Sequence, residues 1–246
     1  MIASNALGFQ LPSDFNVSAF DGVHQLSKVI ADPNDSADPA KRNVWLGYST
    51  AWTGVAVRLR ATFDYNEHFV QSISRSTAPP HEERYFQERA LYGCLSSALS
   101  ALECTYMATY CLCSALAPAV FPLSSAKHLN QSPVVVARIL RRWASSDPFS
   151  EKLESVAVSS EFQELSDFRN TLAHRGVLPR HHRLSNAVVL PSTLPSNPKA
   201  LAEELMYDHE MGPDTTQRHT LWTSRTCSDI VGDLYTFLQA RVPNNA

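Results

Sequence analysis

The sequence is poor in glycine: 246 residues contain only 8, while the 15 prolines gather in a few segments. Scarce glycine and clustered proline predict long uninterrupted elements that are separated by proline-rich turns. Apolar residues recur at helical spacing in the longest of these stretches, so we expect the elements to be helices. The predicted fold is an all-α bundle of long up-and-down helices.

Charged side chains are also scarce, at 18% of the chain, against about a quarter in an average soluble protein. This shortfall predicts a large interior or a buried interface. The formal net charge at pH 7 is −3, which excludes an overall positive field that would hold nucleic acid by counterion release. Any binding of nucleic acid would therefore depend on local basic patches.

Several common signatures are absent. The N-terminus lacks the basic start and apolar run of a secretory signal, so we expect a cytoplasmic protein. Four of the five cysteines lie in one predicted helix, at positions 94, 104, 111 and 113, which predicts small core thiols rather than a disulfide framework. Cys111 and Cys113 point to different sides of a helix, so we expect no metal site there. The phosphate-binding loop and the dinucleotide fingerprint are missing, and we expect no cofactor.

The first 80 residues predict an extension of the main bundle. Residues of about 40–74 place apolar side chains at helical spacing and predict one long helix. Pro79 and Pro80 then predict a helix boundary. We expect this extension, over 1–80, to pack its long helix on a bundle formed by 81–246, the two together making one compact unit.

The stretch of about 81–117 predicts a buried central helix. Between Arg89 and Lys127 the only formally charged residue is Glu103. A membrane span is the alternative for so long an uncharged run. An ionisable residue near the middle of a span costs roughly 2.5–3.5 kcal/mol, and serines and threonines are frequent here, so we favour a helix at the centre of a bundle and expect no membrane contact.

Further helices are predicted after this one. Ser132, followed by proline, opens a short helix. Ser160 and Gln163 form a capping box that opens a helix over about 161–175, and the glycine after it closes the helix. A final helix begins near Thr215.

The helix of about 161–175 ends in a cluster of polar side chains, within the segment DFRNTLAHRG. An apolar stripe forms its inward face and comprises Phe162, Leu165, Phe168 and Leu172. Arg169 lies at the edge of this stripe, and a partly buried guanidinium needs an acceptor. Glu103, alone on the central helix, is the predicted partner.

The segment RNTLAH, from Arg169 to His174, resembles the Arg-x4-6-His motif of the HEPN superfamily, the helical domains named for higher eukaryotes and prokaryotes nucleotide-binding. The polar residue directly after the arginine, Asn170, is a frequent form of that motif. The architecture is similar as well, over about 81–241, because the motif closes a later helix of a bundle and a mostly uncharged earlier helix contributes one polar group to the arginine.

The resemblance implies metal-independent cleavage of RNA in a groove between two protomers that each supply one motif. His174 would take a proton from the ribose 2′-hydroxyl or give one to the leaving oxygen, since imidazole titrates near neutral pH. Arg169 would stabilise charge on the phosphorane, and Asn170 would orient His174 or a phosphate oxygen. Attack by the 2′-hydroxyl would leave a 2′,3′-cyclic phosphate, so DNA is expected to be inert.

The same resemblance implies the partners. We expect a homodimer of the toxin or defence kind that acts on RNA, with an antitoxin or a nucleotidyltransferase as the candidate companion protein. Basic residues near the motif would hold the RNA backbone, namely Arg175, Arg180, His181, His182 and Arg183, with Arg141 and Arg142 as a second patch.

Non-catalytic interpretations stay open. The helix macrodipole favours cations at a helix C-terminus by about 0.3–1 kcal/mol each, which accounts for His174 and Arg175 without any chemistry. Arg169 would then only tie two helices together through Glu103, in a structural dimer or in a module that binds a nucleotide or a partner protein. The second basic patch would be part of a solvated face.

Overall fold

The computed structural model describes residues 2–4, 8, 10–31, 39–73, 81–123, 131–174, 183–184, 187–188 and 212–242. This part of the chain is all-α, as predicted, with seven helices and two very short antiparallel ribbons. The helices are α1 (Val17–Ile30), α2 (Pro39–Ile73), α3 (His81–Leu116), α4 (Pro133–Trp143), α5 (Pro148–Ala157), α6 (Ser160–His174) and α8 (Pro213–Gln239). The ribbons pair β1 (Ile2–Ser4) with β2 (Gln10–Pro12) and β3 (Arg183–Leu184) with β4 (Ala187–Val188).

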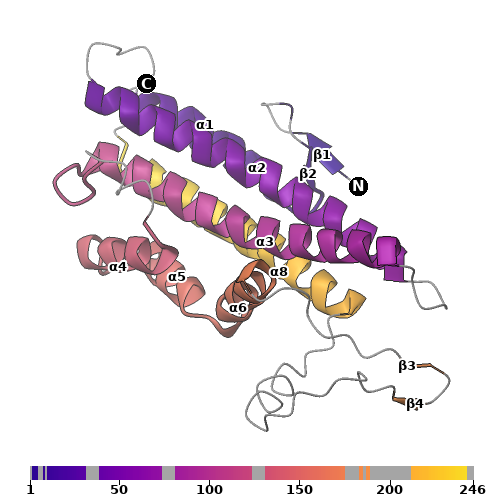
Figure 1. Ribbon diagram of the computed structural model, residues 1–246. Helices are drawn as coiled ribbons and strands as arrows, with labels where there is room; N and C mark the ends of the chain where they lie inside the picture. The colour runs from indigo at the N-terminus through magenta and orange to yellow at the C-terminus, as the bar shows by residue number, and fades with distance from the viewer. Residues whose placement is uncertain are drawn as a thin grey trace, which may run out of the picture.

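Helices α2 and α3 form a long antiparallel hairpin and lie side by side (Figure 1). Two glycines sit at their contact. A Cβ atom on Gly54 would lie 2.7 Å from Sγ of Cys104, and one on Gly93 would lie 2.7 Å from the ring of Tyr65. Glycine at both positions therefore lets the two helices pack this closely. The long helices predicted over about 40–74 and 81–117 are confirmed.

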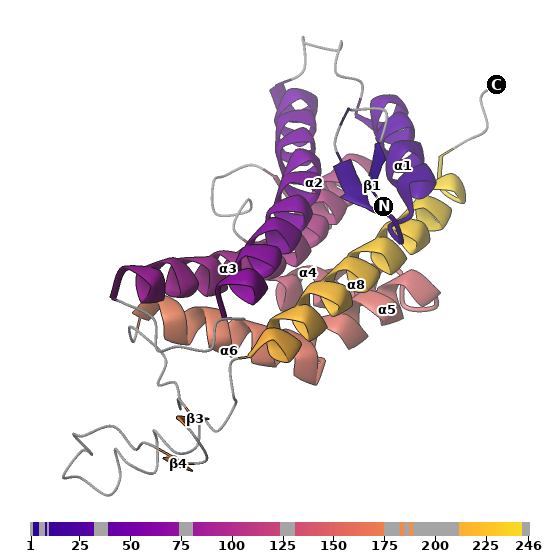
Figure 2. The same ribbon diagram turned by 90° about the vertical axis from the view of Figure 1, so that its right-hand side faces the viewer.

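Helix α3 occupies the centre of the bundle, with α2 on one side and α8, α6 and α4 around the rest (Figure 2). Its buried tyrosines are satisfied, because Tyr106 donates to the Leu153 carbonyl and Tyr110 donates to the Pro122 carbonyl, each at 2.7 Å. One continuous apolar core includes residues of all seven described helices. Residues 1–80 and 81–246 thus contribute to the same core. None of the helices in the described ranges has both the length and the apolar character that a bilayer crossing requires.

One stripe of α3 is open to solvent even though most of the helix is buried. The exposed residues of this open stripe are Tyr85, Arg89, Tyr92 and Glu103, and Ser96 and Ser100 between the last two are partly buried. The long uncharged run of the sequence suggested burial all round, but the neighbouring helices cover only the other sides. The open stripe therefore gives solvent access to the only charged residue in the middle of α3.

Small polar residues and thiols line the contact between α3 and α8. Sγ of Cys94 lies 3.5 Å from Oγ1 of Thr220, and the Thr105 hydroxyl donates to the Cys227 sulfur at 3.7 Å. All five cysteines are free, and all but the partly buried Cys104 are buried. Burial raises the pKa of Cys227 to about 12, which makes that thiol inert. The predicted core thiols are confirmed.

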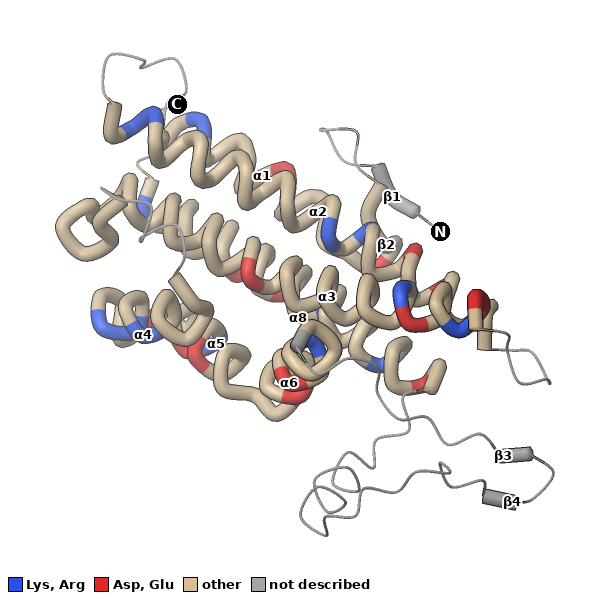
Figure 3. The backbone as a smooth tube through the Cα atoms, in the orientation of Figure 1, with Lys and Arg blue, Asp and Glu red and all other residues tan. Residues whose placement is uncertain are grey.

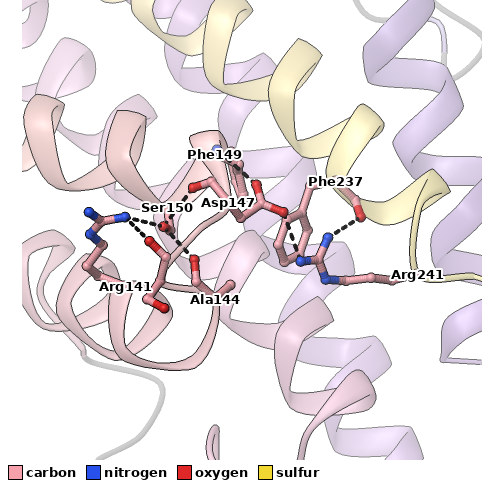
Figure 4. Close-up of polar contacts among 8 residues, drawn as sticks. Arg141, Ala144, Asp147, Phe149, Ser150, Phe237 and Arg241 are labelled. Atoms are coloured by element: carbon pink, nitrogen blue, oxygen red, sulfur yellow. Dashed lines mark hydrogen bonds and ion pairs between the residues drawn. The ribbon is translucent and has the colours of Figure 1, made fainter.

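The turn between α4 and α5 is fixed to the end of α8 by polar contacts (Figure 4). Asp147 caps α5 by accepting from the backbone N–H of Phe149 at 3.0 Å, and its other oxygen accepts from Arg241 at 2.8 Å. Arg241 also donates to the Phe237 carbonyl at 3.1 Å and stacks 3.7 Å from the centre of the Phe237 ring. This corner is a structural joint between three helices.

Helix α6 begins with a different cap from the predicted one. The hydroxyl of Ser159 accepts from the backbone N–H of Phe162 at 3.2 Å, so Ser159 is the capping residue. The predicted capping box of Ser160 and Gln163 is wrong, because the Ser160 hydroxyl instead donates to the Glu161 carboxylate at 3.0 Å. Both serines are consistent with a helix start, and only their contacts distinguish them.

Candidate functional site

Helix α6 is held on α3 and α8 by its inward face. The apolar stripe predicted for it is buried at Phe162, Leu165 and Phe168. Phe168 meets the buried imidazole of His219 edge-on, with the ring centroids 5.6 Å apart. Nearby, Arg218 of α8 donates to Glu164 of α6 at 2.7 Å. These contacts orient α6 and so determine where Arg169 projects.

Arg169 reaches Glu103 of α3, as predicted. Nη2 of Arg169 lies 3.7 Å from Oε1 of Glu103. This is an ion pair, but the distance is too long for a hydrogen bond. The two side chains remain 35% and 44% exposed, so the pair lies at the surface, where α6 meets the open stripe of α3. Solvent therefore reaches both side chains.

The contacts of this pair do not use all the hydrogen-bond donors of Arg169. Desolvation raises the pKa of Glu103, and the nearby Arg169 charge opposes that rise. The Nε atom of Arg169 is buried and has no hydrogen-bond partner among the described residues. A guanidinium has five N–H donors, so a single long ion pair leaves Arg169 with donors for a further acceptor.

The other two residues of the motif follow on the same helix. Asn170 is exposed directly after Arg169, and His174 is the last residue of α6. The side chain of His174 lies outside what the structure describes. The prediction that Arg169 and His174 reach one common anion therefore stays a prediction.

The residues predicted to bind the RNA backbone fall into two groups. Arg175, Arg180, His181 and His182 lie outside the described residues, and Arg183 is described only as a backbone position of β3. In the second patch, Arg142 is exposed on α4. Arg141 is engaged by two carboxylates of α5, with Glu151 at 3.0 Å and Glu154 at 3.6 Å. Its charge is therefore balanced by these two partly exposed carboxylates.

Sequence reasoning missed the role of α8 in placing the motif helix. His219 is only 1% exposed, and its Nε2 lies 3.7 Å from Oε2 of Glu164. The available signal was the spacing of His219, Thr223 and Ile230, which share one face of the final helix. That face packs inward, and it places an imidazole against Phe168, one residue before the motif arginine.

Among the described residues no group of three or more histidine, cysteine, aspartate or glutamate side chains is arranged to hold a metal ion. Comparison of the chain with protein-family models, with curated proteins and with solved structures finds no match in any of the three. The resemblance to the HEPN superfamily therefore depends on the motif and on the helical architecture.

Proposed function

We propose that this protein is a metal-independent endoribonuclease of the toxin or defence type, with Arg169, Asn170 and His174 as its catalytic residues. One observation carries the proposal. Arg169 is half-exposed beside Glu103, with its Nε unpaired among the described residues, on a helix that ends five residues later at His174. The alternatives are a non-catalytic module that binds a nucleotide or protein and a structural helical dimer.

Arg169 would bind the scissile phosphate. Glu103, 3.7 Å from Nη2, holds the guanidinium from the side of α3 and leaves its remaining donors for phosphate oxygens. A planar cation with several donors matches the negative charge that develops on a phosphorane. Glu103 would act as a positioning residue, since it is too weakly coupled to Arg169 to neutralise it fully.

His174 would carry the proton transfers. An imidazole takes the proton of the ribose 2′-hydroxyl, and the 2′-oxygen then forms a bond to phosphorus. The bond from phosphorus to the 5′-oxygen breaks, and that oxygen receives a proton from an imidazolium. In a homodimer with two motifs, one copy of His174 removes the first proton and the second copy donates the other. Asn170, exposed beside Arg169, would orient the imidazole or a phosphate oxygen.

The Arg169–Glu103 pair also gives the non-catalytic alternative its support, because it joins α6 to α3. In that case the motif would fix helix packing, and His174 would interact favourably with the C-terminal end of the helix dipole. An assay of cleavage separates the two functions, whereas an assay of stability alone does not.

The decisive experiment incubates wild-type protein and His174→Ala with a mixed single-stranded RNA in EDTA. We expect wild type to cleave the RNA to products that end in a 2′,3′-cyclic phosphate, and DNA of the same sequence to stay intact. His174→Ala should lower the rate by about 100-fold or more, because general acid–base catalysis contributes that much.

His68→Ala is the matched control, since His68 is an exposed histidine on α2, a helix that carries no residue of the motif. Purified in the same way, it should cleave like wild type, so a loss of cleavage confined to His174→Ala excludes both a contaminating nuclease and a general effect of replacing an exposed histidine. Equal rates for all three proteins, or no cleavage by wild type, would remove the nuclease proposal and leave a binding or structural role.

A further inference from the structure

Three large aromatic side chains are exposed close together on the N-terminal half of α3. Tyr85 is 59% exposed, Phe86 is 46% exposed and Tyr92 is 44% exposed. Tyr85 meets Phe86 edge-on with their ring centroids 5.5 Å apart, and the Arg89 guanidinium lies 5.4 Å from the Phe86 centroid. Single exposed apolar residues are ordinary, but a group of three rings with one cation is a candidate binding surface.

Helical geometry connects this surface to the proposed catalytic site. Tyr85, Arg89 and Tyr92 follow the i, i+4, i+7 spacing of one helix face. Glu103 comes 18 residues after Tyr85, which is about five full turns and so returns to the same face. With a rise of 1.5 Å per residue, Tyr92 lies about 16 Å along the helix from Glu103. Tyr85, Tyr92 and the Arg169–Glu103 pair therefore lie on one face of α3, with the partly buried Ser96 and Ser100 between Tyr92 and Glu103.

The surface is held rigidly from behind by α2. The ring of Tyr65 lies against Gly93, where a Cβ atom would be 2.7 Å from it. Six residues earlier on α3, buried Gln87 donates to the Ser72 carbonyl at 2.9 Å. These contacts fix the part of α3 that presents Tyr92, so a ligand would meet a surface whose backbone is already ordered.

The charges around the rings indicate which ligand fits. Acidic and basic side chains are mixed in this part of α3, with Glu82 and Glu83 beside Arg84 and Arg89 (Figure 3). A surface of mixed charge does not attract a duplex by its phosphates. Exposed tyrosine and phenylalanine rings with one guanidinium do suit unpaired bases, which stack on aromatic faces whatever their sequence.

We propose that Tyr85, Phe86 and Tyr92 form a stacking surface for the unpaired bases of single-stranded RNA. The bound strand would then run along this face of α3 toward Arg169. This inference rests on the proposed function for the choice of RNA as ligand, and it adds that the substrate is single-stranded. Stacking rather than phosphate contact supplies the affinity, so binding should depend only weakly on salt.

The test uses binding, so that it does not depend on cleavage. Fluorescence anisotropy measures the affinity of full-length His174→Ala for a labelled oligouridine, with Tyr85→Leu or Tyr92→Leu added. Each added change should weaken binding about fivefold or more, because one stacked base contributes that much. Tyr85→Phe and Tyr92→Phe should bind like the parent, since they keep the ring. The slope of log affinity against log salt should stay below about 2 in magnitude.

Val158→Thr is the matched control, because Val158 is an exposed apolar residue, 63% exposed, at the end of α5. It should leave RNA binding unchanged, and circular dichroism should show that every variant is folded. Leucine variants that bind like the parent, or a parent that binds no single-stranded RNA, would overturn the inference. A change of oligomeric state by light scattering without any change in RNA binding would overturn it too, and would identify a protein interface instead.

The two proposals fail separately in this design. If wild type does not cleave RNA but tyrosine-dependent binding of single strands is present, the nuclease proposal fails and the stacking surface stands. If wild type cleaves RNA and the leucine variants keep full affinity, the nuclease stands and the stacking surface fails.

Discussion

Arg241 and Arg169 each pair with a carboxylate from another element of the fold, and their contacts differ greatly. Arg241 donates to Asp147 at 2.8 Å and to the Phe237 carbonyl at 3.1 Å, and it stacks on the Phe237 ring (Figure 4). Among the described residues, Arg169 pairs with Glu103 alone, at 3.7 Å, and its buried Nε has no partner.

Arg241 makes its hydrogen bonds within the protein and so has a structural role, whereas Arg169 still has donors that a ligand could use. At the corner of α4, α5 and α8, the hydrogen bonds compensate for the partial desolvation of Arg241. At the junction of α3 and α6, burial of Nε costs free energy that no described contact returns. The rest of the Arg169 side chain is 35% exposed, so its other N–H groups can bind an acceptor from solvent, and an unsatisfied donor in such a side chain is one mark of a functional site.

The largest effect that follows from this comparison is on activity. Arg169→Ala should lower the rate of RNA cleavage by about 100- to 1,000-fold, as loss of one donor to a developing oxyanion does. The free energy of unfolding should change by less than about 1 kcal/mol, because the ion pair is partly exposed. Single-turnover cleavage and urea unfolding of the same preparation give both values.

Arg218→Ala is the matched control, since Arg218 is another partly exposed arginine that pairs with a carboxylate of α6, at 2.7 Å from Glu164. Its cleavage rate should stay within about twofold of wild type. Equal losses of activity in the two variants would mean that Arg169 acts only by holding α6 in place.

The next effect is on stability at the other arginine. Asp147→Ala removes the cap of α5 and the partner of Arg241 together. We expect a loss of about 2 kcal/mol in the free energy of unfolding, measured by urea titration, because a cap alone contributes about 1 kcal/mol.

Asp147→Asn separates the two contributions, since asparagine still caps a helix but carries no charge. It should lose less than Asp147→Ala. Both variants should cleave RNA at the wild-type rate below their melting temperatures. A selective loss of activity in either would contradict the assignment of this corner as purely structural.

Much of this comparison could be read from the sequence. The helical spacing of apolar residues predicted the extents of α2 and α3, because long periodic segments carry many independent signals. Glu103 was predictable as the partner of Arg169 because it is the only charged residue in the middle of α3. An isolated charge on a buried helix needs a partner, and few candidates were available.

Other features depend on contacts that local sequence does not encode. Ser159 and Ser160 are adjacent and chemically identical, so the choice of cap depended on how α6 docks. The pairing of Arg141 with Glu151 and Glu154 requires that α4 and α5 fold back on each other. The exposure of Tyr92 depends on which sides of α3 its neighbours leave uncovered.

The smallest effect concerns Glu103 itself. Desolvation raises its pKa, so the folded protein holds this proton more tightly than the unfolded chain does. The resulting stabilisation is complete below the usual range of a glutamate pKa and is lost as the pH rises through the higher folded value. Toward neutral pH the carboxylate therefore costs stability, and the free energy of unfolding of Glu103→Gln should equal that of wild type or exceed it by less than about 1 kcal/mol. Urea titrations near pH 7 and near pH 4 should show that this difference in the free energy of unfolding narrows in acid. If Glu103→Gln instead lost as much stability as Asp147→Ala, the Arg169–Glu103 pair would be a structural contact like Arg241–Asp147.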